Sequence, residues 1–303
     1  MRLCSVLCLL TLLFAEAANA QDFRLPGTEP SPFSQYRRRR SRNYDPQSGA
    51  LLNRMGVPEW DNGEEFQEDV FTFVRAQFGS GYGSWDTDFP DSDLNFSYRL
   101  QQLTSIKVNP NPIVLPLTDP RLFDYPFVYF CEPGRGGGGG RWGGGGLEFT
   151  PEEAAAFRKY LDNGGFAMFD DFWGEYEWDN FHYEIKKVFP DRDYRDIPLE
   201  HPIFHCVFDL KERPQVPSIG IGVRGLGAGP NGTNISWERS DAREVHYRGY
   251  FVDNDRLMVI ICHNTDLGDG WEEEGVDERY FHEYSEKKAY PMGVNIVFYA
   301  MTH

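Results

Sequence analysis

Residues 150–174, TPEEAAAFRKYLDNGGFAMFDDFWG, constrain the fold more than any other stretch of the chain. Thr150 is a favourable N-cap, and Glu153 three residues later completes a capping box, so a helix should begin here. An apolar helical face follows, and the helix should end at Gly164, since glycine accepts the left-handed backbone found after helix C-termini. The continuous apolar run 166–169 then predicts a strand that is covered on both faces.

Two carboxylates, Asp170 and Asp171, follow this strand directly. In an open parallel sheet, ligands bind at the carboxyl ends of the strands. We therefore take Asp170 and Asp171 as catalytic candidates, with His201 as a third that could reach them from a later loop. Together with His201, from the later segment HPIFH, they are also candidate ligands of a divalent metal. Two alternatives stay open: acid–base chemistry by neighbouring carboxyl groups, and simple capping of the next helix.

Apolar runs and helical patterns alternate along the rest of the chain. Strands are predicted at 70–78, 127–131, 219–223, 245–252 and 257–262. Helices are predicted from residue 91 or 92, over the apolar positions 181–189, and at the end of the chain over 289–301. Such alternation predicts one α/β domain with a mainly parallel sheet.

The first 63 residues should lie outside this domain. A basic residue, the apolar run 6–14 and the ending Ala-Asn-Ala predict a secretory signal peptide over residues 1–20, and therefore export. Residues 21–63, with the basic run Arg37–Arg40, should form a mostly disordered linker. The folded domain should cover residues 64–303, with a flexible glycine-rich insertion at 134–146 that fits no phosphate-binding motif.

Composition limits the partners and the role of the cysteines. The formal net charge of −17 argues against nucleic acid as a partner, since phosphate binding needs a basic surface. No apolar run is long enough for a stable membrane span after signal cleavage. Three cysteines remain in the mature chain, namely Cys131, Cys206 and Cys262, and each lies in an apolar run. We expect them to be buried residues rather than a disulfide framework.

Polar groups also follow other predicted strands, and aromatic residues flank them. If the strands are parallel, the groups at their carboxyl ends meet along one edge of the sheet. Tryptophans near this edge could line a ligand cleft, although aromatic residues more often pack in cores. The expected binding residues are Trp85, Asp88, Glu132, Trp173, His263 and Asp266.

Several segments together resemble the bacterial DUF4159 family over residues 65–302. They are WDTDFP at 85–90, LQQLTSIKV at 100–108, YPFVYF at 125–130, FRKYLDNGGFAMFDDFWG at 157–174, VFP at 188–190, LEHPIF at 199–204 and GVNIVFYA at 293–300. The resemblance implies a three-layer, flavodoxin-like domain similar to class I glutamine amidotransferases. It also implies a bacterial, exported or membrane-associated protein. Relatives are often encoded beside MoxR-type ATPases and von Willebrand A-domain proteins, which implies an envelope partner.

The chain departs from true amidotransferases where their chemistry resides. Their nucleophilic cysteine follows a buried strand on a tight, glycine-flanked turn, whereas here the strand ends in Asp170-Asp171-Phe172. Because a thiol mechanism needs a thiolate beside a base, we expect no glutaminase activity. The leading hypothesis is an exported ligand- or partner-binding domain. The alternatives are a metal-assisted hydrolase using Asp170, Asp171 and His201, and a structural component of a MoxR and von Willebrand A-type complex.

Overall fold

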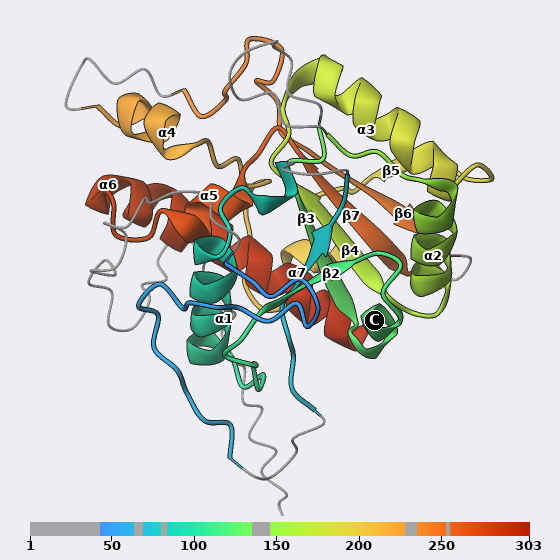
Figure 1. Ribbon diagram of the computed structural model, residues 1–303. Helices are drawn as coiled ribbons and strands as arrows, with labels where there is room; N and C mark the ends of the chain where they lie inside the picture. The colour runs from blue at the N-terminus through green and yellow to red at the C-terminus, as the bar shows by residue number, and fades with distance from the viewer. Residues whose placement is uncertain (1–42, 64–68, 80–83, 135–145, 228–234, 253–254) are drawn as a thin grey trace, which may run out of the picture.

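The computed structural model describes residues 43–63, 69–79, 84–134, 146–227, 235–252 and 255–303. Within them lies a seven-stranded sheet with the order β2-β1-β3-β4-β7-β6-β5 (Figure 1). The strands are β1 (Val74–Gln77), β2 (Ile113–Pro116), β3 (Phe127–Cys131), β4 (Phe166–Asp170), β5 (Arg195–Asp196), β6 (His246–Phe251) and β7 (Leu257–His263).

The sheet is mainly parallel, as the alternation of strands and helices predicted. Strands β2, β1, β3, β4 and β7 pair in parallel, whereas β6 and β5 are antiparallel additions at one side. The strands predicted at 245–252 and 257–262 are β6 and β7, and they pair as antiparallel neighbours. β4 lies between β3 and β7, so its carboxyl end is in the middle of the sheet.

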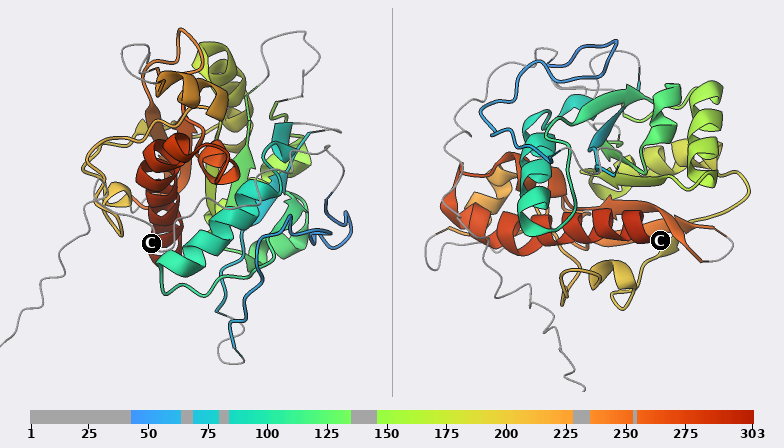
Figure 2. Two further views of the ribbon diagram at one scale, coloured as in Figure 1. Left: turned by 90° about the vertical axis from the view of Figure 1, so that its left-hand side faces the viewer. Right: turned by 90° about the horizontal axis from the view of Figure 1, so that it is seen from below.

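Helices cover both faces of the sheet and complete three layers (Figures 1 and 2). The helices are α1 (Asp91–Leu103), α2 (Pro151–Asp162), α3 (Gly174–Val188), α4 (Ile219–Gly225), α5 (Leu267–Glu272), α6 (Glu278–Tyr280), the π-helical segment η5 (Phe281–Ala289) and α7 (Tyr290–Thr302). Helices α2 and α3 pack on one face, and α1, α5 and α7 pack on the other. The fold is thus α/β and consistent with a flavodoxin-like arrangement.

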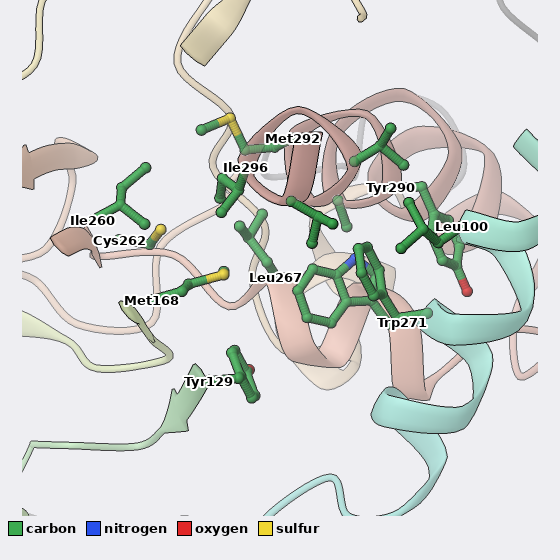
Figure 3. Close-up of a cluster of buried hydrophobic side chains, with 14 of the residues drawn as sticks. Leu100, Tyr129, Met168, Ile260, Cys262, Leu267, Trp271, Tyr290, Met292 and Ile296 are labelled. Carbon is green, nitrogen blue, oxygen red and sulfur yellow. The ribbon is translucent and has the colours of Figure 1, made fainter. Parts of the chain in front are cut away.

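Two apolar cores, one on each face, hold the layers together. The first joins α1, α5 and α7 to the sheet, and Figure 3 shows Trp271 of α5 among its side chains. The Trp271 ring lies 4.5 Å from that of Phe96 on α1 and 5.7 Å from that of Tyr129 on β3. Large aromatic side chains supply much of the apolar area that a core buries, so these contacts fix α5 against the sheet.

The α2–β4 unit forms as its sequence predicts. Thr150 Oγ1 accepts from the amide of Glu153, and the Glu153 carboxylate accepts from the amide of Thr150. Gly164 has φ +101°, the left-handed conformation expected after the helix. The apolar strand that follows is buried along its whole length. Local chemistry therefore delivers Asp170 and Asp171 to the middle of the sheet.

The prediction of a strand at 219–223 is wrong, because this segment lies in the helix α4. Its first free amides are satisfied by side chains: Glu238 accepts from the amide of Ser218, and Asp269 accepts from the amide of Ile219. A Cβ on Gly222 would lie 2.6 Å from the Tyr280 ring. The helix thus depends on tertiary partners far along the chain, which a local apolar pattern does not reveal.

The prediction of a mostly disordered linker over residues 21–63 is wrong for the part that the structure describes. Tyr44 and Val57 are buried, and the amide of Val114 on β2 donates to the carbonyl of Gly49 at 3.0 Å. This segment therefore covers the edge strand β2, which would otherwise offer unpaired backbone groups. The predicted signal peptide, the run Arg37–Arg40 and most of the glycine-rich insertion lie outside the described residues.

No helix among the residues that the structure describes is long and apolar enough to cross a membrane.

Candidate functional site

Three neighbouring strands end level with one another and turn in the same way. The carbonyl of Asp170 accepts from the amide of Glu132 at 3.0 Å, and the carbonyl of Thr265 accepts from the amide of Asp171 at 3.2 Å. The first residue after each strand has a left-handed backbone: φ is +46° at Glu132, +58° at Asp171 and +64° at Asn264. Such conformations cost about 1 kcal/mol or more for residues other than glycine, and they cluster at functional sites.

A loop between β1 and α1 brings a further carboxylate, Asp88, to these strand ends. Asp88 is buried, and its Oδ2 lies 3.7 Å from the sulfur of Cys131, the last residue of β3. Its backbone is also left-handed, with φ +60°. Asp88 therefore joins the carboxyl edge of the sheet from a segment that precedes β3 in the sequence.

The fully buried guanidinium of Arg75, on β1, fixes this loop. It donates to the carbonyls of Trp85 at 2.9 Å and Thr87 at 2.8 Å, and to both carboxylate oxygens of Asp93. Because Thr87 directly precedes Asp88, the position of Asp88 depends on this buried cation. Arg75 was not predicted, since a single arginine within an apolar run gives no local signal of such a role.

Two groups of side chains at this edge could each hold a metal ion. The first is Asp88, Cys131 and Asp171, and the second is Asp88, Asp269 and Glu272. Within each group the ligand atoms all lie within 4.8 Å of one another. Asp269 and Glu272 lie on α5 and were not among the predicted site residues. Their position could have been found from the strand end at His263, which α5 follows closely.

The excess of carboxylates in a buried place makes their protonation unusual. Burial, then the charge of Glu132, raises the pKa of Asp88 to about 7, although Arg75 opposes this rise. Burial also raises the pKa of Asp170 to about 7. Burial and the same Glu132 charge raise the pKa of Asp171 well above its usual range. A bound divalent cation would reverse these shifts, because it is the largest charge in any site that it occupies.

Asp170 is completely buried beside these groups. Its Oδ2 accepts from the hydroxyl of Tyr129 at 3.2 Å and from the amide of Gly268 at 3.0 Å. Its Oδ1 has no hydrogen bond of regular geometry among the described residues. Asp170 belongs to neither group of candidate ligands, whereas Asp171 belongs to the first.

The structure does not bring His201 to the carboxylates. Its Nδ1 accepts from the amide of Ile203 at 3.2 Å, and its ring contacts those of Phe251 and Tyr299. Phe251 ends β6, which runs antiparallel to β7, so His201 lies near the amino end of β7. The predicted set of Asp170, Asp171 and His201 is thus split between opposite ends of the sheet.

His263 supports the site rather than lining it. Its Nδ1 accepts from the guanidinium of Arg248 at 3.0 Å, and its Nε2 donates to the carbonyl of Gly174 at 3.1 Å. The ring stacks on Phe172 at 4.8 Å. Burial lowers the pKa of His263 to about 3, so the imidazole stays neutral. It orients the backbone that follows Asp171.

The remaining predicted binding residues lie at or near the same edge. The indole of Trp173 donates to Oδ1 of Asp171 at 3.1 Å and so orients that carboxylate. Asp266 caps α5 by accepting from the amide of Asp269 at 2.7 Å. Glu132 lies close enough to raise the pKa values of its acidic neighbours. Trp85 is buried and contributes its carbonyl to Arg75.

A separate surface pocket of about 240 Å³ lies against η5 and the segment 210–214. Its lysines already have acidic partners: Lys287 pairs with Glu283 at 2.8 Å, and Lys288 pairs with Glu212 at 3.5 Å. These charges are partly or largely exposed and are paired with acids, so the pocket is a weak candidate for chemistry. The carboxyl edge of the sheet is the stronger candidate.

The comparisons with known proteins agree with the resemblance drawn from the motifs. The model of a family described as a domain of unknown function, DUF4159, matches residues 71–301. No curated protein matches the chain. Since the match spans most of the chain and the whole of the sheet, the protein belongs to the DUF4159 family.

Proposed function

We propose that this domain binds a divalent cation at the carboxyl edge of its sheet and uses it to hold an oxygen-rich ligand. The observation that carries the proposal is the approach of Asp88, Cys131 and Asp171 to within 4.8 Å of one another. Two carboxylates and a thiol suit Zn²⁺, which accepts oxygen and sulfur ligands. A bound cation would displace the proton of the Cys131 thiol. Without a cation, burial and the charge of Asp88 hold the pKa of this thiol well above its usual range.

The fully buried Oδ1 of Asp170 supports a ligand here independently of the three candidate ligands. A buried carboxylate oxygen without a regular hydrogen bond is costly unless an ion or a bound molecule interacts with it. Trp173 and Arg75 meanwhile fix Asp171 and the Asp88 loop, in the way that surrounding residues commonly orient metal ligands.

A metal-assisted hydrolase is the second candidate, and one observation favours it. The pKa of Asp170 is raised to about 7, so its carboxyl group could accept a proton from a metal-bound water or a substrate near neutral pH. His201 has no part in this version, because it lies near the other end of the strands. The protein would then act on an ester- or amide-type substrate at the edge that Asp171 lines.

The broader expectations from the family are kept as part of this proposal. The domain is similar to the glutamine amidotransferase-like folds in having a mainly parallel, three-layered sheet, but Asp170 and Asp171 stand where their nucleophile follows a strand. We expect it to be exported by bacteria and to work in the cell envelope. A complex with MoxR-type ATPases and von Willebrand A-domain proteins is the partner that the resemblance suggests.

Titration calorimetry with Zn²⁺, Mn²⁺ and Ca²⁺ tests the cation site, after a chelator has removed any metal from the protein. Asp171→Asn is a suitable variant because asparagine tolerates the left-handed φ of +58° as well as aspartate does. Removing this ligand should weaken binding by about tenfold or more. The exposed Glu152→Gln, on α2, is the matched control and should bind like wild type. Equal binding by the Asp171→Asn variant, or none by wild type, would overturn the proposal.

A further inference from the structure

We propose that the carboxyl edge holds a pair of divalent cations, bridged by the carboxylate of Asp88. This inference rests on the proposed function, because it adds a second ion beside the first. The second ion would be bound by Asp88, Asp269 and Glu272, whose ligand atoms lie within 4.8 Å of one another. All three ligands are carboxylates, so this position suits a hard cation such as Mn²⁺ or Mg²⁺.

The common member of the two groups is the first argument. Asp88 lies within 4.8 Å of the ligand atoms of both groups, so one carboxylate can serve two ions with its two oxygens. In proteins with two-metal sites the ions are about 3.5–4 Å apart, a distance that a single carboxylate spans. The left-handed backbone of Asp88 and the anchoring of its loop by Arg75 hold this carboxylate between the two positions.

Helix α5 presents the other two ligands in a fixed arrangement. Asp269 and Glu272 are three residues apart, so they lie on the same side of the helix. Oδ2 of Asp269 accepts from the amide of Ile219 at 2.9 Å, and the backbone amide of Asp269 donates to Oδ1 of Asp266 at 2.7 Å, so both the side chain and the backbone of Asp269 are fixed. The side-chain amide of Asn95, on α1, donates to the carbonyl of Trp271 at 2.9 Å and ties the helix to the domain.

The buried Oδ1 of Asp170, which has no hydrogen bond of regular geometry among the described residues, is a separate observation that favours a cation at this edge. Asp170 is completely buried, and its other oxygen accepts from the amide of Gly268, the residue before Asp269. A Cβ on Gly268 would lie 2.8 Å from Oδ2 of Asp88 and 2.8 Å from the hydroxyl of Tyr129. A glycine at this position therefore allows Asp88 and Tyr129 to approach the backbone whose amide donates to Asp170.

Charge balance also favours two ions over one. The four carboxylates of the two groups, Asp88, Asp171, Asp269 and Glu272, carry four negative charges when ionised. Arg75 is the only cation among the main charges that act on Asp88, and it is already paired with Asp93. With the Cys131 thiolate that a bound cation would create, the ligands would carry five negative charges, so two divalent cations balance them more nearly than one does. A buried excess of like charges is strongly unfavourable.

Mn²⁺ binding to the full-length protein, freed of metal with a chelator, tests this inference. Equilibrium dialysis should give two ions per chain for wild type, and electron paramagnetic resonance should show the spin-coupled signal of a close Mn²⁺ pair. Glu272→Gln should bind one ion and give the signal of an isolated Mn²⁺. Asp269→Asn, which removes the other ligand of the second ion, should give the same result and replaces Glu272→Gln if that variant folds poorly. Glu278→Gln, an exposed substitution one helix later, is the matched control and should keep both ions.

The outcomes separate this inference from the proposed function. One ion per wild-type chain, unaffected by Glu272→Gln but lost in Asp171→Asn, would overturn the pair and leave the single site. Two ions without spin coupling would show separate sites and exclude Asp88 as a bridge. No binding at all would overturn both proposals.

Discussion

The Nε of Arg75 donates to both carboxylate oxygens of Asp93 at 3.0 Å, and both side chains are completely buried. The pair joins β1 to the first turn of α1, and the same guanidinium bonds the loop that carries Asp88. Stability and the geometry of the candidate metal site therefore depend on one buried cation.

Arg75→Met should separate these two roles when it is compared with a double variant. The single change leaves Asp93 charged and without its partner, which should lower the free energy of unfolding by about 3–5 kcal/mol. Arg75→Met with Asp93→Leu should recover much of this loss, because no charge stays buried. Neither variant should bind cations like wild type, since the carbonyls of Trp85 and Thr87 lose their donor. Urea denaturation and calorimetry measure the two effects.

Restored cation binding in the double variant would contradict the role of Arg75 in positioning Asp88.

The stability of the metal-free protein should increase as the pH falls. The pKa of Asp170 is near 3.8 in the unfolded chain and about 7 in the folded protein, so the folded state binds more protons between these values. This contribution is complete below about pH 4 and is lost as the pH rises through about 7. Asp88, also with a pKa of about 7, has the same sign, whereas His263, with a pKa lowered to about 3, opposes both below its unfolded value.

Asp170→Asn isolates the effect, because the amide keeps the shape of the side chain and does not titrate. Denaturation in the presence of a chelator at about pH 5 and about pH 8 should show wild type gaining at least about 1 kcal/mol relative to the variant at the lower pH. Saturating cation should reduce or reverse this gain, since protons and the cation compete for the same carboxylates. An identical pH dependence of wild type and Asp170→Asn would refute the expected titration.

Gly268→Ala should close the site with little change elsewhere. The new methyl group would lie 2.8 Å from Oδ2 of Asp88 and from the hydroxyl of Tyr129, closer than normal contact distances. Either side chain would have to move, so cation affinity should fall by about tenfold or more. Gly220→Ala, where nothing lies within 4 Å of the added carbon, is the matched control. Calorimetry that finds unchanged binding in both variants would show that this approach is unimportant.

The sequence predicted best those features that local chemistry determines. The capping box at Thr150, the apolar strand predicted over 166–169 and the carboxylate of Asp170 directly after it follow from residues within one short segment. The parallel sheet followed from the alternation of elements, and with it the meeting of Asp171 and Glu132 at one edge. Asp88 was among the expected binding residues, but its position beside Cys131 depends on the loop before α1, which the sequence did not predict.

The contacts that the sequence could not predict are those between distant segments. Asp269 reaches the site because α5 packs Trp271 between α1 and β3, which no local pattern shows. His201 was misplaced because a histidine before a proline carries no information about which end of the sheet it occupies. Arg75 looked like an interruption of an apolar strand, although its burial organises the whole loop before α1.

Gly49→Ala should test whether the segment before residue 64 is part of the folded domain. Gly49 has φ +77°, and a Cβ there would lie 2.2 Å from the carbonyl oxygen of Val114 on β2. Alanine in this backbone conformation costs about 1–2 kcal/mol before the clash is counted. We expect the turn to leave the edge strand, which lowers the melting temperature and promotes association through β2. Gly63→Ala, with a similar φ of +73° but open surroundings, controls for strain alone.

A monomeric Gly49→Ala protein with the melting temperature of the Gly63→Ala control would show that this segment contributes nothing to the domain.

Cys131→Ser should change the choice of metal without creating or abolishing a nucleophile. The sulfur lies 3.7 Å from Asp88, and burial together with that carboxylate holds the pKa of the thiol well above its usual range, so no thiolate forms in the metal-free protein. Serine offers a hard oxygen in place of sulfur. Zn²⁺ affinity should therefore fall by about tenfold or more while Mn²⁺ affinity changes much less, which competition with a coloured chelator can measure.

Wild type should release no ammonia from glutamine, and glutamine hydrolysis that disappears in Cys131→Ala would contradict the neutral thiol inferred from this burial.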